Sequence, residues 1–503
     1  MYLLKADEVD ILLLLEGTYP YVHGGVSSWI SQLINAYPQY TFGAIFLGSR
    51  PEDYKDIRYT FPPNLKHLEV HYLFSGHSLP PIQPQFGNKE GFQCIDRIHD
   101  WFRTPNTCPY EPRLEQLEFY LDPDKGVDYN QFLYGKLAWS YITKIYEERS
   151  TDPSFIHYFW AIRNMHAPIW VVAEIAANAP KAKIFHSAST GYAGYLGALL
   201  KHEHKRPYIL SEHGIYSKER KIDLLQTHVL RDEFNTQLQT SFDIGYIENV
   251  WINFFNALGL FCYRAADTIV SLFQAARKRQ ILDGAPEEKT VIIPNGVNIP
   301  AFKIARHSDN PPSVVALIGR VVPIKDIKTF IRAIRIVANR KPDTEAWIVG
   351  PTEEDPEYFE ECKSLVTSLE LTDKVKFLGI QKTAEILAKV GVIALSSISE
   401  GLPLVLLEGF AAGIPAVVTD VGSCRQLVMG DEEADQAIGP SGRVVSIANP
   451  KAFADALITL FTPEYWHPAS KAAIERVERF YSQDRMFGSY TKIYEEALKQ
   501  WQE

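Results

Sequence analysis

The fold is decided by the stretch Val314-Val-Ala-Leu-Ile-Gly-Arg-Val-Val-Pro-Ile-Lys-Asp326, which is followed by Ile327–Arg340. Five consecutive apolar residues at Val314–Ile318 predict a strand that is buried on both faces. The loop after this strand contains a glycine and two cations, and Ile327–Arg340 then has the apolar period of an amphipathic helix. A buried strand, a loop and a helix form the repeating unit of a parallel α/β sheet.

The same pattern recurs along the whole chain. In the first half, strands are predicted at Val9–Leu15, Thr41–Leu47, Phe155–Phe159, Lys183–His186, Tyr208–Ser211, Thr268–Leu272 and Thr290–Pro294. In the second half, further strands are predicted at Ala346–Val349, Val375–Leu378, Val392–Leu395 and Ala416–Thr419. Because helical segments lie between many of them, we predict an α/β protein with doubly wound parallel sheets.

The length of 503 residues indicates more than one domain. The polar, proline-containing segment Ala301–Pro312 resembles a linker. We therefore predict a first domain over residues 1–300 and a second domain over residues 301–479. Residues about 50–150 are rich in proline and aromatic side chains and fit the alternation poorly, so we interpret them as an insertion into the first domain.

The composition excludes several classes of protein. The net charge of −10 argues against general binding to nucleic acid or to anionic membranes. Five dispersed cysteines without a C-x-x-C motif predict reduced thiols rather than disulfides or a zinc cluster. The N-terminus lacks the basic region of a signal peptide, and no apolar stretch approaches the roughly 20 residues of a membrane span. We expect a cytoplasmic protein with no direct membrane span.

Three motifs are absent from the sequence: G-x-G-x-x-G, G-x-x-x-x-G-K-[ST] and H-E-x-x-H. Their absence disfavours ordinary NAD-linked Rossmann enzymes, P-loop NTPases and zincin metalloproteases.

A glycine loop follows the first predicted strand. Gly24 and Gly25 precede a helical run that extends from Trp29 to Ala36. Adjacent glycines let the backbone approach a ligand closely, and the N-terminus of a helix offers free N–H groups to an anion. The loop therefore either faces a phosphate or forms a tight strand-to-helix turn.

Arg320 and Lys325 follow the strand Val314–Ile318, at its carboxyl end. Open α/β sheets bind their ligands at that end. A guanidinium can contact a phosphate with two N–H groups, and an ammonium adds a point charge. These two cations are candidate phosphate ligands; the alternative is that both are solvated surface residues.

Two carboxylates flank the segment Gly401-Leu-Pro-Leu-Val-Leu-Leu407. Glu400 lies in a loop after a predicted strand, whereas Glu408 lies in an apolar helical run. A carboxylate with apolar neighbours needs hydroxyl or cationic partners, and carboxylates accept pairs of sugar hydroxyls well. For Glu408 alone, an exposed position on the helix is the alternative.

Two other patterns receive structural interpretations. Asp122-Pro-Asp124 has the D-x-D form of a metal-binding motif, but its proline and the nearby glycine indicate a turn, so we predict no metal site. Gly191, Gly194 and Gly197 recur every three residues, and this spacing predicts close packing of one helix face.

The combination of G-R-x-x-x-x-K, E-x7-E and Pro294-Asn-Gly-Val297 resembles the retaining glycosyltransferases of family GT4, which have the GT-B fold. This resemblance covers nearly the whole chain. The segments Leu14–Trp29 and His157–Arg163 carry a narrower resemblance, to the PelF-type cytosolic glycosyltransferases of Pel exopolysaccharide synthesis.

The resemblance implies two facing Rossmann-like domains. The acceptor binds mainly to the first and the nucleotide mainly to the second, and a C-terminal helix at about 480–503 completes the first domain. It also implies roles for seven residues. The donor pyrophosphate is contacted by Arg320 and Lys325, and Gly24 and Gly25 lie near the phosphates. The ribose is bound by Glu408. The donor sugar in the catalytic centre is contacted by Glu400 and His213. From its strand-end position alone, His213 is either structural or functional.

We therefore expect a metal-independent, retaining glycosyltransferase that uses a UDP-sugar donor and no cofactor. Its expected acceptor is a growing biofilm exopolysaccharide, and its expected partners are inner-membrane proteins of a synthase and export complex, which recruit it. Two alternatives stay open: a GT-B sugar-nucleotide epimerase, and a non-catalytic nucleotide-binding scaffold subunit of a membrane polysaccharide synthase.

Overall fold

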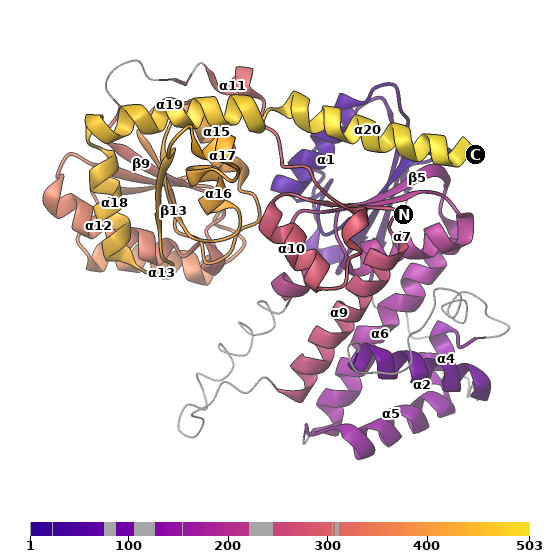
Figure 1. The fold of residues 1–503 in the computed structure, drawn as a ribbon. Helices are drawn as coiled ribbons and strands as arrows, with labels where there is room; N and C mark the ends of the chain where they lie inside the picture. Colours follow the sequence, from indigo (N-terminus) through magenta and orange to yellow (C-terminus); the bar gives the residue numbers. More distant parts are fainter. Residues whose placement is uncertain are drawn as a thin grey trace. The chain divides into compact units, whose positions relative to one another are not determined.

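The computed structural model describes residues 2–22, 24–74, 87–104, 126–152, 154–220, 245–303, 305–306 and 311–502. The chain forms two compact units, which can be followed by their colours in Figure 1. The first comprises Met1–Ile292 together with Lys492–Glu503, and the second comprises Ile293–Thr491.

The predicted boundaries between the units are at residues 300 and 480, whereas the first unit ends at Ile292 and resumes at Lys492. The segment after residue 292 belongs to the second unit because Val297 pairs with Ser482 and donates its backbone N–H to the carbonyl of Tyr481 (2.9 Å). The C-terminal helix α20 (Gln483–Gln502) contributes to the first unit only from Lys492 onward.

The first unit is built on an eight-stranded sheet with the order β1-β4-β3-β2-β5-β6-β7-β8. Its strands are β1 (Tyr2–Leu4), β2 (Glu8–Glu16), β3 (Phe42–Gly48), β4 (Leu65–Tyr72), β5 (Lys181–Ser187), β6 (Tyr208–Glu212), β7 (Thr268–Ser271) and β8 (Thr290–Ile292). All neighbouring pairs are parallel except β1 with β4. The chain runs outward from β2 to β4 and then continues at β5 on the other side of β2.

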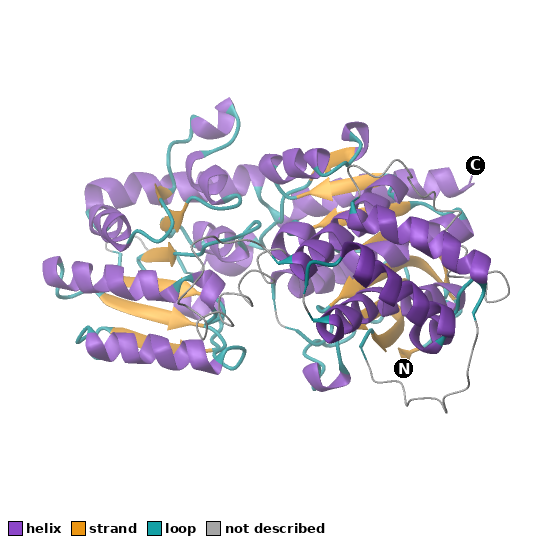
Figure 2. Cartoon of the chain, turned by 90° about the horizontal axis from the view of Figure 1, so that it is seen from below, coloured by secondary structure: helices purple, strands orange, loops and turns teal. Residues whose placement is uncertain are grey.

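Helices connect these strands and cover the sheet, as Figure 2 shows with strands in orange. The main ones are α1 (Gly25–Ala36), α6 (Phe155–Asn178), α7 (Gly191–His204), α9 (Tyr246–Ala265) and α10 (Gln274–Leu282). The first ten residues of α7 are buried, because this helix packs between β2, β5, α6 and α9.

The glycine spacing in α7 has the predicted structural role. A Cβ atom at Gly194 would lie 2.8 Å from the sulfur of Cys262, and one at Gly197 would collide with the ring of Tyr208. The helix can approach its neighbours this closely because these positions carry no side chain. The prediction of close helix packing is confirmed.

A helical insertion is present, but it begins later than predicted. Its helices are α2 (Lys89–Arg103), α4 (Tyr129–Tyr134) and α5 (Lys136–Arg149), which pack with α6 and α9. The predicted start near residue 50 is wrong, because β4 lies in the sheet between β1 and β3. The polar residues His67 and Glu69 obscured this strand in the sequence; both are buried, and their side chains face each other at 3.7 Å.

The predicted strand at Phe155–Phe159 is also wrong, because these residues begin helix α6. The side chain of Ser154 accepts a hydrogen bond from the backbone N–H of His157 (3.2 Å), which caps the helix. A short apolar run is compatible with either a strand or a buried helix, and here the helix continues to Asn178.

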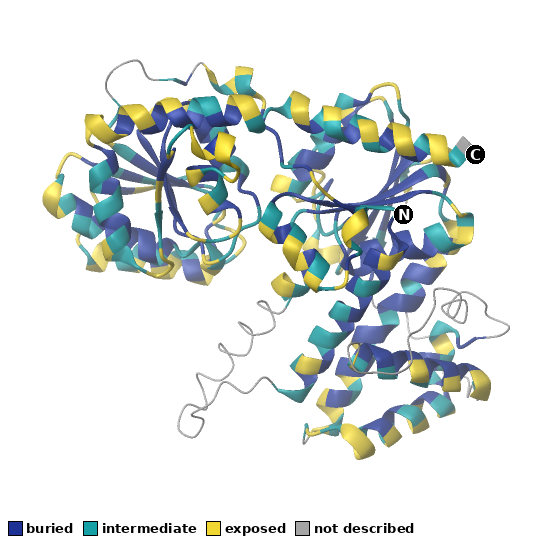
Figure 3. Ribbon diagram, in the orientation of Figure 1, coloured by how far each residue is buried: buried dark blue, intermediate teal, exposed yellow. Residues whose placement is uncertain are grey.

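The second unit contains a six-stranded parallel sheet with the order β11-β10-β9-β12-β13-β14. Its strands are β9 (Val314–Ile318), β10 (Glu345–Val349), β11 (Val375–Gly379), β12 (Val392–Leu395), β13 (Ala416–Thr419) and β14 (Gly442–Val445). Around it lie α12 (Ile327–Arg340), α13 (Pro356–Ser368), α15 (Leu404–Ala411), α18 (Pro450–Leu460) and α19 (Pro463–Phe480). Figure 3 shows the buried strands and the exposed outer faces of the helices.

The end of α20 is anchored to the first unit. The hydroxyl of Tyr494 is hydrogen-bonded to Nδ1 of His186 on β5 (2.8 Å), and its ring packs edge-on against Tyr37. Within the parts of the chain that the structure describes, no helix is both long and apolar enough to cross a membrane.

We expect Gly197→Ala to destabilise the first unit by roughly 1–3 kcal/mol, because the added methyl group overpacks the contact with Tyr208. The matched control is Gly259→Ala on the neighbouring helix α9, where an added Cβ meets no atom within 4 Å. Thermal and urea unfolding of both variants tests this, and equal stability of the two would contradict it.

Candidate functional site

In the second unit, the sheet has a topological switch point beside β9. After β9 the chain continues to β10 and β11 on one side, and β12 then forms the other side. The loops after β9, β12 and β13 meet here: Ser396 donates its hydroxyl to the carbonyl of Lys325 (2.9 Å), and Gly422 lies against the backbone of Glu400. A switch point is the usual ligand-binding position of an open α/β sheet.

Two of the predicted site residues contact each other at this position. Nζ of Lys325 lies 2.5 Å from Oε1 of Glu400, and the hydroxyl of Ser397 donates to the same oxygen (2.5 Å). The side chains of Lys325 and Glu400 are 20% and 10% exposed, so the pair is largely shielded yet reachable by a ligand.

Arg320 lies on the same edge but has another partner. Its Nη1 is 2.5 Å from Oε1 of Glu354, and both side chains are about half exposed, at 46% and 50%. Glu354 belongs to the loop after β10. The backbones of the two loops pack so closely that a Cβ atom at Gly350 would collide with the carbonyl of Gly319.

Glu408 lies on α15, partly buried among apolar neighbours. Burial raises the pKa of its carboxyl group from 4.5 to about 7. Among the described residues, no donor makes a hydrogen bond to this carboxylate. Ligand hydroxyl groups could therefore supply the missing hydrogen bonds.

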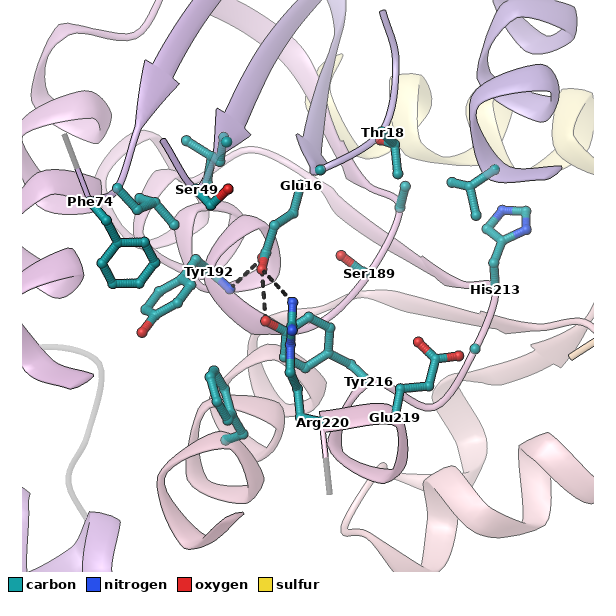
Figure 4. Close-up of a pocket in the computed structure, with 18 of the residues that line it drawn as sticks. Glu16, Thr18, Ser49, Phe74, Ser189, Tyr192, His213, Tyr216, Glu219 and Arg220 are labelled. Atoms are coloured by element: carbon teal, nitrogen blue, oxygen red, sulfur yellow. Dashed lines mark hydrogen bonds and ion pairs between the residues drawn. The ribbon is translucent and has the colours of Figure 1, made fainter. Parts of the chain in front are cut away.

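The first unit has a cavity of about 670 Å³ at its own switch point, beside β2 and β5 (Figure 4). Glu16, the last residue of β2, lies in this cavity. One carboxylate oxygen accepts the backbone N–H groups of Tyr192 (2.9 Å) and Ala193 (3.2 Å), at the N-terminus of α7. The other accepts the hydroxyl of Tyr216 (2.7 Å), and Arg220 lies 4.0 Å away. Glu16 therefore has a fixed orientation, with its charge stabilised by the helix N-terminus.

Aromatic side chains make up much of the cavity lining. They are Tyr54, Phe74, Tyr192, Tyr216, Trp251 and Phe255. The polar lining includes Thr18, Ser49, Ser189 and Glu219. A few polar groups among aromatic rings are typical of a pocket for an organic ligand with both apolar and hydroxyl-bearing faces.

His213 lines the same cavity, and its ring packs edge-on against Trp29, with 4.3 Å between the two ring centroids. Its Nε2 atom is buried and has no hydrogen-bond partner among the residues that the structure describes. Burial lowers the pKa of His213 to about 3, so its imidazole is neutral at physiological pH. A neutral ring can exchange hydrogen bonds with a ligand hydroxyl but supplies no positive charge.

The glycine loop begins α1, with Gly24 as its N-cap residue. A Cβ atom at Gly24 would meet nothing within 4 Å, so there is open space beside this position. Val26, in the first turn of α1, lines the cavity. The N-terminus of α1 therefore adjoins the cavity that contains His213.

The seven predicted residues thus divide between the units. Gly24, Gly25 and His213 belong to the first, and Arg320, Lys325, Glu400 and Glu408 belong to the second. Sequence reasoning did not select Glu16 as a site residue, although it immediately precedes the glycine-containing loop.

The predicted turn at Asp122–Asp124 lies outside the described residues. Within the described ranges, no group of three or more His, Cys, Asp or Glu side chains is arranged to hold a metal ion.

Comparison with family models covers both units. Residues 9–288 match a domain of unknown function, DUF3492, and residues 312–462 match the glycosyl transferases group 1 model. The chain belongs to the DUF3492 family. Its second unit carries the group 1 glycosyltransferase domain, which confirms the predicted resemblance at the level of this broad family.

Curated relatives cover part of the chain. The D-inositol 3-phosphate glycosyltransferase of Kineococcus radiotolerans is 29% identical over 214 residues, which are 39% of this chain and 49% of the relative. The N-acetyl-alpha-D-glucosaminyl L-malate synthase of Bacillus anthracis is 28% identical over 35% of this chain and 43% of the relative. The chain spans about half the length, or less, of these relatives.

Solved structures match nearly the whole chain. HepE from Anabaena, crystallised with UDP and glucose, has a TM-score of 0.58 and 16% identity over 97% of this chain and 100% of that one. Sucrose-phosphate synthase from Thermosynechococcus elongatus has a TM-score of 0.58 and 16% identity over 98% and 100%. These similarities confirm the predicted GT-B fold, with two Rossmann-like α/β domains.

The raised pKa of Glu408 predicts a pH-dependent stability. Because the native state holds its proton more tightly than the unfolded state, the stability that comes from this group falls as pH rises from 4.5 to about 7. Glu408→Gln should therefore resemble the parent near pH 4.5 and be more stable at pH 8, by up to about 3 kcal/mol.

Urea unfolding between pH 5 and pH 8 measures this difference. Glu357→Gln, at an exposed position of α13, is the control and should keep the pH profile of the parent. A difference between Glu408→Gln and the parent that is the same at every pH would show that Glu408 is not the titrating group.

Proposed function

We propose that this protein is a retaining glycosyltransferase that uses a UDP-sugar. The observation that carries this proposal is the arrangement of Lys325, Glu400 and Glu408 around the switch point of a domain that matches the group 1 glycosyltransferases. The structural relative HepE was crystallised with UDP and with UDP-glucose, which supports this class of donor.

The proposed donor site follows from charge. Breaking a sugar–phosphate bond leaves negative charge on the departing UDP and develops positive charge on the sugar. Arg320 and Lys325 would stabilise the pyrophosphate, so we propose that no metal ion or cofactor is required. Glu408 would accept the ribose hydroxyls, while Glu400, already held by Lys325, would lie near the donor sugar.

The first unit is proposed to bind the acceptor saccharide in the cavity around Glu16. Sugar rings present apolar C–H faces that stack on aromatic side chains such as Trp251, and hydroxyl groups that donate to carboxylates. The neutral His213, which the GT4 resemblance assigns to the donor sugar, would hydrogen-bond to a hydroxyl of that sugar. Retention would follow from attack on the same face as the departing phosphate, a route that the GT4 resemblance suggests.

The finer proposal concerns the biological role. We propose that the acceptor is a growing exopolysaccharide of the Pel type, and that the cytoplasmic enzyme is recruited by inner-membrane proteins of the synthase and export complex. The support is the resemblance carried by Leu14–Trp29 and His157–Arg163. Fractionation of cells with and without those membrane proteins tests the recruitment.

We expect Lys325→Ala to weaken UDP binding by at least tenfold, because the pyrophosphate loses a partly buried cation and Glu400 loses its partner. Lys328→Ala on α12, where the partly exposed lysine pairs with Glu361, is the matched control and should bind like the parent. Calorimetry with UDP in excess EDTA measures both. Equal affinities of the parent and Lys325→Ala would refute the donor site, and loss of binding in EDTA would refute metal independence.

Product analysis separates the proposed reaction from its alternatives. Release of UDP with a glycosylated acceptor supports transfer. Interconversion of UDP-sugars without transfer would indicate the epimerase, and UDP binding without turnover of any tested donor would indicate a scaffold subunit.

We expect Trp251→Ala to raise the KM for acceptor oligosaccharide several-fold while UDP affinity stays unchanged, because Trp251 lines the cavity and stacks on Phe255 (5.6 Å). The control is Trp139→Ala, at an exposed position of α5 that does not line the cavity. Steady-state kinetics with varied acceptor measures the effect. An unchanged acceptor KM together with reduced UDP affinity would reverse the assignment.

A further inference from the structure

Both cations of the proposed donor site are already paired with carboxylates. Lys325 contacts Glu400, which itself belongs to the site. Arg320 contacts Glu354, which no role proposed above uses. A phosphate that binds Arg320 therefore has to displace Glu354 or bind beside its negative charge.

The position of Glu354 is set by the backbone. Gly319 donates its N–H to the carbonyl of Val349 (2.8 Å), and Val321 donates to that of Pro351 (3.0 Å), so the loops after β9 and β10 are joined on both sides of Arg320. Gly350 packs directly against Gly319. These contacts hold the loop that carries Glu354 next to the loop that carries Arg320.

The neighbouring acidic residues of this loop have other roles. Glu353 accepts the backbone N–H of Thr352 (3.0 Å), and Asp355 caps α13 by accepting the N–H of Tyr358 (2.9 Å). Among the described residues of this loop, Glu354 is the one paired with Arg320.

We propose that Glu354 is a specificity-determining residue that disfavours the product UDP relative to the UDP-sugar donor. The proposal rests on the proposed function. The pyrophosphate of a UDP-sugar carries about two negative charges. Free UDP carries about three at neutral pH, because its terminal phosphate ionises again with a pKa near 6. A carboxylate beside Arg320 repels the more highly charged ligand more strongly, which favours release of the product.

The expected effect is modest, because Arg320 and Glu354 are both about half exposed and exposed ion pairs are weak. Glu354→Gln keeps the shape of the side chain and removes its charge. We expect this variant to bind UDP about two- to fivefold more tightly at pH 8, with a smaller gain for UDP-glucose and none for uridine. The gain for UDP should shrink in high salt, because salt screens exposed charges, and at pH 5.5, where the terminal phosphate takes up a proton.

Calorimetry on the full-length parent, Glu354→Gln and the charge-matched control Glu357→Gln tests this, with UDP, UDP-glucose and uridine as the probes. Product inhibition by UDP should be stronger in Glu354→Gln than in the parent, and Glu357→Gln should behave like the parent.

If Glu354→Gln gained the same affinity for UDP and for UDP-glucose, or gained affinity for neither, the role of Glu354 would be overturned while the donor site stayed intact. Failure of the parent itself to bind UDP would instead overturn the proposed function, and this inference with it. The two failures are therefore distinguishable in one set of titrations.

Discussion

The arrangement of both candidate sites depends on one topological constraint. Each sheet grows in two directions from a single strand, β2 in the first unit and β9 in the second. The connections from these strands and from their neighbours β5 and β12 lead to opposite sides, so their loops diverge at the carboxyl edge and leave room for a ligand. Glu16 ends β2, and the loop with Arg320 and Lys325 follows β9. The candidate site residues therefore lie where the strand order requires the loops to separate.

The two sites hold their charges in different ways. Glu16 accepts two backbone N–H groups and a tyrosine hydroxyl, so its orientation does not depend on a ligand. In contrast, Arg320 is paired with a half-exposed carboxylate that a phosphate can replace. If the donor binds here as proposed, a phosphate that displaces Glu354 exchanges one ionic partner of Arg320 for another, which costs little free energy at an exposed position. Glu408 is a third case, because its carboxylate is desolvated and no described residue donates a hydrogen bond to it.

The sequence allowed most of the sheets to be predicted, because strands such as Val314–Ile318 and Val392–Leu395 are short apolar runs buried on both faces. It failed where an apolar run lay in a helix, at Phe155–Phe159, and where a buried strand carried polar residues that pair with each other, at Leu65–Tyr72. The candidate site residues that follow β9 and β12 could be identified from the sequence because they belong to short local motifs. Glu16 could not, since its partners Tyr192 and Tyr216 lie 176 and 200 residues further along the chain.

The protonation state of His213 limits how the proposed reaction can work. Burial alone lowers its pKa to about 3, and its ring packs against Trp29, so the imidazole stays neutral over the physiological pH range. It cannot supply positive charge to a departing pyrophosphate. In the proposed reaction that charge has to come from Arg320 and Lys325, and both of them are paired with carboxylates in the structure. The two carboxylates nearly balance the two cations, so in the proposed reaction phosphate oxygens have to compete with Glu354 and Glu400 for the positive charge that stabilises the leaving group.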